Sequence, residues 1–498
     1  MNKEEFYIGL DIGSSSVKAA LVEVQSGKND CLIQEPQNEM HIHSSEKGWA
    51  EQDPELWWKH TCSAIRQLLK KSKRKPAQIK GIGLAYQMHG LVVIDKKGNL
   101  LRDSIIWCDS RAVKIGERAF NELGNSYCNE HLLNSPANFT ASKLKWVKNN
   151  EPEIFEKIYK MMLPGDYISY RLSGKINTTI SGLSEGILWD FKENTIAYKL
   201  LDHYEIPYSF IPEIIDTFSK QAVISEKGSE ESGLLAGTPV LYRAGDQPNN
   251  ALSLNVLKPG EIAATGGTSG VVYAITDQSS TKENTRINNF AHVNYDLTFP
   301  SIGKLLNING AGIQLRWLKE NLEISSYDEM NQLASQVEPG ADGLRVIPFG
   351  NGAERVFKNK IIGSHFINLD LNRHTKAHLC RATLEGIAFA FAYGINILKS
   401  DLTAVKTLKV GNDNLFQSEI FSTTIANLIN GNIELYNTTG AIGAARACAL
   451  FCNDFETFGK LISKNDHLKT YTPEENNANY LKIYKEWEEL LTNILKWQ

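Results

Sequence analysis

Short apolar runs alternate with polar turns and longer amphipathic stretches from the start of the chain. Residues 6–11 and 17–24 are two such runs on either side of a Gly/Ser turn, and their length is typical of strands. Asp53 and Pro54 supply an N-cap and a first-turn proline, so a helix is expected over residues 55–69. Further buried strands are expected at residues 79–84 and 91–95.

The same alternation continues through the rest of the chain. Residues 237–246 predict a strand that ends at Asp246, followed by a helix that starts near Asn249. Further helices are expected at 141–150, 153–161, 313–321, 382–398 and 440–450 and beyond 472, and a further strand at 407–410. Strands that alternate with helices indicate the α/β fold class, with helices packed against sheets.

A chain of 498 residues is too long for one hydrophobic core, so two large domains are expected. Lys258-Pro259-Gly260 interrupts the pattern near the middle of the chain, where Pro and Gly favour a break. The sequence therefore predicts an N-terminal domain over residues 1–255 and a C-terminal domain over residues 256–498.

One turn occurs twice. Residues 8–17 and 262–271 share the layout of an apolar strand, a Gly/Ser/Thr turn and a second strand. Gly13 corresponds to Gly267 and Ser14 to Thr268, and Ser15 continues the first turn. Backbone amides and short hydroxyls in such turns bind anions, so two copies predict two domains that grip one polyphosphate. The alternative is a pair of ordinary hairpin turns, which are common in proteins.

Composition argues against two classes of protein, nucleic-acid binders and membrane proteins. A net charge of −4 argues against a nucleic-acid binder with a dominant basic face. The seven cysteines form no CxxC pair, which is typical of reduced thiols in a cytoplasmic protein, and Cys448 and Cys452 are expected in a packed helix. No signal peptide or bilayer-spanning run is found, so a cytoplasmic location without membrane contact is expected.

The motifs indicate phosphoryl transfer of a particular kind. The chain has neither a GxxxxGK[ST] loop nor a GxGxxG loop between strand and helix. The remaining candidate is an ATP site in which the two Gly/Ser/Thr turns bind the phosphates, as in actin-like or hexokinase-like proteins. Asp11 beside the first turn is suited to Mg²⁺. Asp246, at the end of its strand, is the candidate general base for a sugar hydroxyl, with a helix N-cap as the alternative.

Three loops supply candidate ligand contacts. Gln87-Met88-His89-Gly90 carries donors and acceptors for a polyol, although a loop histidine is also commonly structural. Trp107 is a candidate wall for a sugar, and an Asp109–Arg111 contact that fixes the loop is the alternative. Candidate nucleotide contacts are Gly310-Ala311-Gly312 and Gly411-Asn412-Asp413-Asn414, each of which is also an ordinary turn sequence.

Taken together, these motifs resemble the FGGY family of carbohydrate kinases over essentially the whole chain. Gln87-Met88-His89-Gly90 is similar to the members that act on xylulose, and glycerol kinases carry an Arg-Glu pair there instead. The remaining matching segments are 11–16, Gly48 to Pro54 with Trp57-Trp58, Gly245-Asp246, 265–270, 338–344 and 381–386.

The resemblance implies two ribonuclease-H-like domains, of the actin and hexokinase ATPase type, around a central cleft with ATP on the C-terminal side. It implies Asp246 as the base, sugar contacts at Gln87, Met88, His89 and Gln247, and Mg²⁺ near Asp11. The implied ATP contacts are Gly13, Ser14, Ser15, Gly267, Thr268, Gly310, Gly411 and Asn414.

The implied reaction is transfer of the γ-phosphate of ATP to the 5-hydroxyl of D-xylulose. Another ketose or polyol, such as ribulose or glycerol, and a non-enzymatic ATP-binding switch remain the alternatives. The expected partners are thus ATP and a small sugar, and the sequence leaves a homodimer open. Three positions depart from the family pattern: Gln247 replaces Asn, Gly411-Asn412 replaces consecutive glycines, and Asn368 replaces a Gly.

Overall fold

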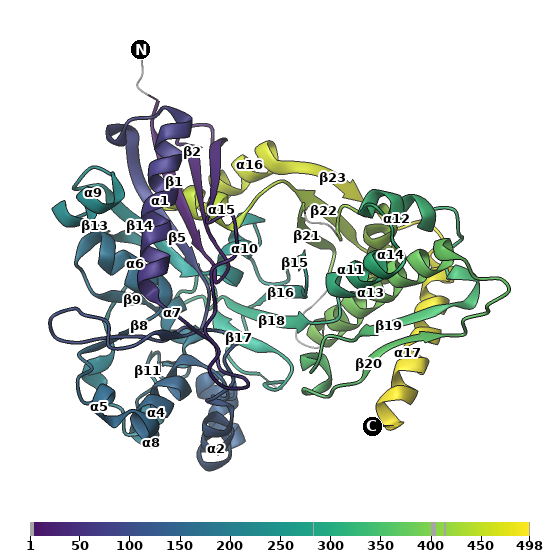
Figure 1. Cartoon of the computed structure of the whole chain (residues 1–498), viewed down its shortest axis with the longest axis horizontal. Helices are drawn as coiled ribbons and strands as arrows, with labels where there is room; N and C mark the ends of the chain where they lie inside the picture. Colours follow the sequence, from purple (N-terminus) through teal and green to yellow (C-terminus); the bar gives the residue numbers. More distant parts are fainter. Residues whose placement is uncertain (1–3, 282, 400–404, 413–414, 498) are drawn as a thin grey trace.

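The computed structural model describes residues 4–281, 283–399, 405–412 and 415–497. Two α/β domains lie side by side, each built on its own central sheet (Figure 1). The N-terminal sheet has the order β13-β14-β5-β1-β2-β3. Its strands are β1 (Phe6–Ile12), β2 (Val17–Glu23), β3 (Asn29–Glu35), β5 (Ile79–Tyr86), β13 (Phe218–Val223) and β14 (Pro239–Gly245).

The C-terminal sheet has the order β17-β18-β16-β15-β21-β22-β23. Its strands are β15 (Ile262–Gly266), β16 (Gly270–Thr276), β17 (Asn288–Ala291), β18 (Ile302–Ile308), β21 (Thr407–Gly411), β22 (Asn432–Tyr436) and β23 (His467–Tyr471).

The six strands of the N-terminal sheet have counterparts in the C-terminal sheet, which adds β17 at its edge. In each, three antiparallel strands (β1-β2-β3 and β15-β16-β18) lie beside two strands parallel to the first (β5-β14 and β21-β22). An antiparallel strand, β13 or β23, follows in both sheets. This arrangement confirms the prediction of two ribonuclease-H-like domains.

Helices cover the sheets as the apolar patterns predicted. Asp53 caps α1 (Pro54–Ser72) by accepting the Glu55 amide at 2.8 Å. The main helices are α2 (Val113–Leu123), α4 (Thr140–Asn150), α6 (Pro164–Ser173), α7 (Ile180–Glu185), α8 (Tyr198–Tyr204), α9 (Glu226–Ser232), α10 (Asp246–Ser253), α11 (Gly312–Asn321), α12 (Tyr327–Ala334), α13 (Lys376–Leu398), α14 (Glu419–Ile429), α15 (Gly440–Ala447), α16 (Phe455–Asp466) and α17 (Ala478–Trp497).

Three local predictions are wrong. Residues 153–161 do not form one helix, because α5 (Pro152–Phe155) is a single turn and β8 (Lys160–Met162) pairs with β6 (Val92–Ile94). Buried strand pairing decides this segment over helix propensity. The helix after β14 begins at Asp246 and not near Asn249. Cys448 is buried as expected, whereas Cys452 is exposed just beyond the helical segment.

Helix α15 connects the two halves. It follows β22 of the C-terminal sheet, yet it packs against β1 and β5 of the N-terminal sheet. A Cβ atom on Gly9 would lie 1.9 Å from the Ala441 carbonyl oxygen, and one on Gly83 would lie 1.9 Å from the Ala444 carbonyl oxygen. Only glycine in the strands permits so close an approach of helix and sheet backbones.

A second connection joins α7 to the edge strand β17. The Ala291 amide donates to the Ser184 hydroxyl at 2.9 Å, and the Ser181 hydroxyl donates to the Ala291 carbonyl at 3.0 Å. Asn134 and the backbone of Asn289 exchange two hydrogen bonds of 2.6 and 2.8 Å. The first half therefore supplies partners for a strand edge of the second half.

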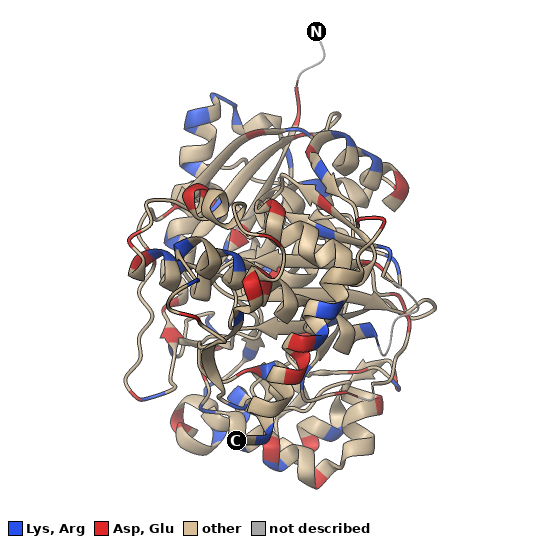
Figure 2. Cartoon of the chain, turned by 90° about the vertical axis from the view of Figure 1, so that its right-hand side faces the viewer, with Lys and Arg blue, Asp and Glu red and all other residues tan. Residues whose placement is uncertain are grey.

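Acidic and basic residues are interspersed along the same helices on the side shown in Figure 2. In the described part of the chain, every helix is too short or too polar to cross a bilayer.

We expect Gly9→Ala to destabilise the protein, because the added methyl would overlap the backbone of α15. Overpacking of this kind costs on the order of 3 kcal/mol, which corresponds to a fall in Tm of roughly 5–10 °C. Gly411→Ala is the matched control, because a Cβ there meets nothing within 4 Å. Equal melting temperatures for the two variants in a thermal scan would contradict the close packing of α15.

Candidate functional site

Three neighbouring parallel strands end at the same edge of the N-terminal sheet. Asp11 near the end of β1 and Ala244 near the end of β14 both align with Ala85 of β5. Gln87 and Asp246 directly follow the last residues of β5 and β14, so they lie at the edge that Asp11 occupies. Sequence reasoning placed these three residues in separate motifs, and the sheet brings them together.

Asp246 is the first residue of α10, and Gly245 is the N-cap. The alternative that Asp246 caps this helix is therefore wrong. Burial, and then the negative charge of Asp11, raise the pKa of Asp246 to about 7, against hydrogen bonds from Gln247. A carboxyl group with this pKa accepts a proton readily near neutral pH.

Asp11 lies beneath the first turn of α15. Its Oδ2 atom is 2.5 Å from the position that a Cβ on Gly440 would take. Burial raises the pKa of Asp11, and Lys18, its cross-strand neighbour on β2, opposes that shift. Asp11 and Asp246 are thus two crowded carboxylates, a pair that a cation would relieve.

The turn at residues 13–15 is the first of the two predicted phosphate sites, called here the first phosphate turn. It closes on itself, with the Gly13 amide donating to the Ser16 carbonyl at 3.0 Å. The Ser14 carbonyl accepts from Gln52 Nε2 at 2.7 Å, and the Ser15 carbonyl accepts the Met40 amide at 2.8 Å. Among the described residues, none accepts from the amides of Ser14 or Ser15. These two amides are available to an anion.

The second phosphate turn is held by α11. The Gly312 amide donates to the Gly267 carbonyl at 3.2 Å, and the Ile313 amide donates to the Thr268 carbonyl at 2.9 Å. Gly267 and Thr268 are exposed. Gln247 and Thr265 line the same small cavity, so the turn that carries Asp246 and the second phosphate turn face each other across a narrow gap.

The loop after β5 is buried and tightly fixed. His89 adopts a positive φ of 62°, and its Nδ1 donates to the Glu185 carbonyl at 2.8 Å. Burial, and then the charge of Lys143, lower the pKa of His89 to about 3, so the ring is neutral and its Nε2 is an acceptor. Gln87 is also buried, and its Oε1 has no hydrogen-bond partner among the described residues.

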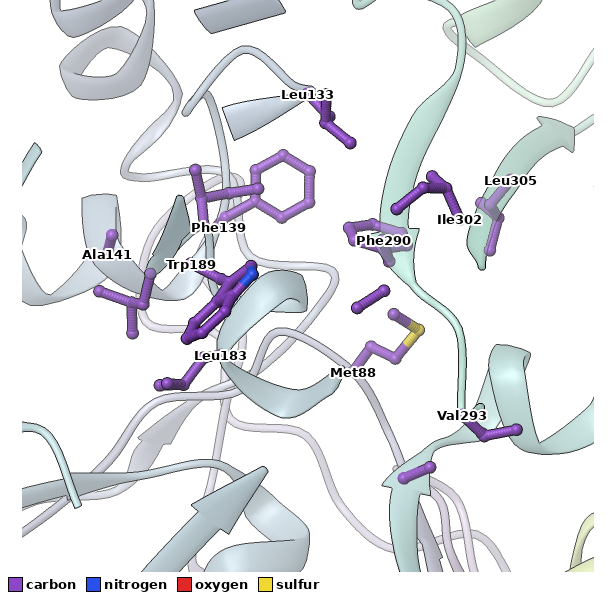
Figure 3. Packing of buried hydrophobic residues seen from close by; sticks show 14 of the residues in the cluster. Met88, Leu133, Phe139, Ala141, Leu183, Trp189, Phe290, Val293, Ile302 and Leu305 are labelled. Carbon is purple, nitrogen blue, oxygen red and sulfur yellow. The ribbon is translucent and has the colours of Figure 1, made fainter. Parts of the chain in front are cut away.

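Aromatic rings from both halves surround His89. Phe139 packs edge-on at 4.9 Å between ring centroids, and Phe290 of β17 lies at 5.3 Å. Met88 belongs to the same buried cluster (Figure 3). The loop therefore presents polar atoms from within an apolar wall, which is typical of a small-molecule site.

The loop that contains Trp107 is fixed by an ion pair. Arg111 Nη2 lies 2.7 Å from Asp109 Oδ2, and Asp109 is fully buried. This confirms the predicted Asp109–Arg111 contact. Trp107 is 52% exposed, and its indole nitrogen donates to the Ser14 hydroxyl at 3.3 Å. Trp107 thus lies at the first phosphate turn.

A cavity of about 340 Å³ lies between α11 and the hairpin of β19 (Arg345–Phe349) and β20 (Gly363–Ile367). Gly310 lies beside it, since a Cβ there would meet the Pro348 carbonyl oxygen at 2.1 Å. The lining residues are Ile313, Gln314, Trp317, Pro348, Gly350, Ser364 and Phe366.

Gly411 lies in open space at the end of β21, outside the lining of this cavity. Strand β21 pairs with β15, and Val410 lies opposite Ala264. Gly411 therefore lies at the same sheet edge as the second phosphate turn. The predicted contact at Asn414 lies outside the described residues.

Sequence reasoning missed several residues of this region. Phe290 and Glu185 are far from Gln87 along the chain, and no local pattern connects them. Glu354 is buried beside the loop at Gly310, where Oε2 accepts the Asn309 amide at 3.0 Å. Gln314 and Trp317 are part of an ordinary amphipathic helix in the sequence.

Family models match both halves of the chain. The N-terminal domain of the FGGY family of carbohydrate kinases matches residues 6–253, and its C-terminal domain matches residues 262–451. The chain belongs to the FGGY family. It is therefore a carbohydrate kinase, and kinases of this family use ATP as the phosphate donor.

Individual relatives have different substrates in their names. The chain is 28% identical to a xylulose kinase of Staphylococcus xylosus, over 96% of this chain and 98% of that one. It is also 28% identical to a glycerol kinase of Thermococcus gammatolerans, over 99% of each. The structure of a xylulose kinase from Rhodospirillum rubrum has the same fold, with a TM-score of 0.87 at 23% identity over 99% of each chain.

We expect Asp11→Asn to lower the pKa of Asp246, because it removes the negative charge that helps to raise it. The pKa can be measured in the nucleotide-free protein from the ¹³C shift of labelled aspartate carboxyls, with Asp246→Asn to assign the signal. Asp296→Asn, at an exposed turn, is the control. An unchanged Asp246 signal in Asp11→Asn would contradict the coupling of the two carboxylates.

Proposed function

We propose that this carbohydrate kinase transfers the γ-phosphoryl group of ATP to the 5-hydroxyl of D-xylulose, giving D-xylulose 5-phosphate and ADP. The observation that carries this proposal is the Gln87-Met88-His89 segment, with Gln87 and Met88 buried, at the strand edge that carries Asp246. The similarity to xylulose kinases over nearly the whole chain supports it.

In the proposed reaction, Asp246 acts as the general base. The sugar 5-hydroxyl oxygen attacks the γ-phosphorus as its proton passes to the carboxylate. The bond from the γ-phosphorus to the β,γ-bridging oxygen breaks, and ADP leaves with that electron pair. Gln87, Met88, His89 and Gln247 hold the sugar so that this hydroxyl meets Asp246.

ATP is gripped from both halves of the chain in this proposal. The amides of Ser14 and Ser15 in one turn, and of Gly267 and Thr268 in the other, bind phosphate oxygens, with Gly13 shaping the first turn. The cavity beside Gly310 is large enough for a nucleobase, and the rings of Trp317 and Phe366 form part of its wall. Gly411 and Asn414 complete the nucleotide side.

Asp11 fits the Mg²⁺ that is typical of such kinases. It supplies a buried carboxylate close to a second one, and Mg²⁺ in proteins is commonly held by one or two carboxylates together with substrate phosphates. When bound, the ion would neutralise charge on the transferring group.

The proposed division of labour follows the two domains, with residues 1–255 binding the sugar and residues 256–498 the nucleotide. Phe290 reaches the sugar side from the second domain. Closure of the domains excludes water, which otherwise competes as the phosphoryl acceptor.

Glycerol is the second candidate acceptor, because a glycerol kinase is as similar in sequence as a xylulose kinase. The segment Met88-His89 argues against glycerol, because glycerol kinases carry an Arg-Glu pair at this place.

The test is a panel of acceptors with saturating MgATP, monitored by ADP release. D-xylulose is expected to give the highest kcat/KM among D-xylulose, D-ribulose, L-ribulose and glycerol, and ¹³C NMR is expected to locate the phosphate on C5. Strong activity on glycerol with none on the pentuloses would overturn the proposal. ATP hydrolysis that no acceptor accelerates would favour an ATP-binding switch.

We expect Asp246→Asn to lower kcat about 10²–10⁴-fold, because the amide cannot take the hydroxyl proton. The dissociation constant for ATP, measured by calorimetry, is expected to stay within about threefold. Asp216→Asn is the matched control, because it makes the same change at an exposed aspartate. Wild-type turnover in Asp246→Asn would exclude this residue as the base.

A further inference from the structure

A second carboxyl group lies beside the proposed base. Glu185 ends α7 and is only 1% exposed. Its Oε2 atom lies 2.3 Å from the position that a Cβ on Gly245 would take, and Met88 Cγ lies 2.7 Å from the same point. The Glu185 carboxyl therefore touches the backbone of the residue that precedes Asp246, next to a proposed sugar contact.

The two oxygens of this carboxyl group have no hydrogen-bond partner at bonding distance among the described residues. The His89 amide and the Tyr86 hydroxyl lie near enough to lower its pKa, against the larger effects of burial and of negative charge. The buried guanidinium of Arg243 is engaged elsewhere, with Asp166 at 2.9 Å and with Asn177 at 2.9 Å. A buried polar group without a partner is unfavourable, which indicates that a ligand completes it.

The pKa of the Glu185 carboxyl group depends on its surroundings. Burial, and then the negative charges of Asp246 and Asp166, raise the pKa of Glu185 well above its ordinary value. A raised pKa favours the protonated carboxyl group, which has one O–H donor and acceptor capacity on both oxygens. That combination matches a sugar hydroxyl, which also donates and accepts.

The position of Glu185 is rigid. Its carbonyl accepts the His89 Nδ1–H at 2.8 Å, so it holds one proposed sugar contact directly. Ser181 and Ser184 tie the same short helix to β17. A group held in this way can select among substrates by geometry.

We infer that Glu185 is a specificity-determining residue, whose carboxyl group hydrogen-bonds the acceptor hydroxyl on the carbon next to the one that is phosphorylated. Because Glu185 contacts the residue before the base, the two carboxyl groups serve neighbouring hydroxyls. This inference rests on the proposed function and adds the group that distinguishes D-xylulose from its 4-epimer, L-ribulose.

The test compares Glu185→Gln with Glu185→Met in the full chain. Glu185→Gln keeps a donor and an acceptor, so kcat and KM for D-xylulose are expected within about fivefold of wild type. Glu185→Met keeps the volume and removes both, so KM is expected to rise about 10–100-fold with kcat within about threefold. The preference for D-xylulose over L-ribulose, as a ratio of kcat/KM, is expected to fall at least about tenfold.

Melting temperature separates this role from a structural one. An unpartnered buried acid destabilises the free protein, so Glu185→Met is expected to raise Tm while it weakens sugar binding. The dissociation constant for ATP is expected to stay the same in both variants. Glu185→Ala replaces Glu185→Met if the latter does not fold.

Two results would overturn the inference alone. One is wild-type KM and wild-type epimer preference in Glu185→Met, with D-xylulose still phosphorylated. The other is a loss of kcat in Glu185→Gln as large as in Asp246→Asn, which would assign an ionised carboxylate to position 185. If the wild-type protein phosphorylates no pentulose, the proposed function fails first and the inference with it.

Discussion

The contact between α15 and the N-terminal sheet is the constraint on which the rest of the structure depends. Gly9 and Gly83 let the helix backbone touch two strands directly, so a helix of the second half becomes part of the first. The same helix brings Gly440 against Asp11, and the Gly440 carbonyl accepts from Asn249 on α10 at 2.9 Å. One packing contact thus fixes both sides of the proposed catalytic edge.

Around that edge the protein buries several carboxyl groups where few cations compensate them. Asp11, Asp246 and Glu185 all have raised pKa values, with burial as the largest cause in each. Asp246 begins α10 and Asp11 lies against the first residue of α15, and a helix N-terminus stabilises negative charge. Such strain is typical of sites that are completed by a cation, a phosphate or a sugar.

Much of the fold was predictable from sequence, because the turn at Gly13 and its copy at Gly267 interrupt clear apolar runs. The sequence marked Asp11, Gln87 and Asp246 each as a candidate site residue. It did not predict that they lie together at one sheet edge, because a local pattern does not reveal the order of the strands. The helix predicted over residues 153–161 failed because burial against β6 outweighed propensity. Glu185 and Phe290 gave no signal, because their proximity to His89 depends entirely on tertiary packing.

The edge strand β17 has one further consequence. Its outward backbone groups bond to side chains of Asn134, Ser181 and Ser184, all from the other half of the chain. A C-terminal half produced by itself would leave those groups bare, and bare strand edges recruit strands from other copies. The first half therefore protects the second half from self-association through this strand edge.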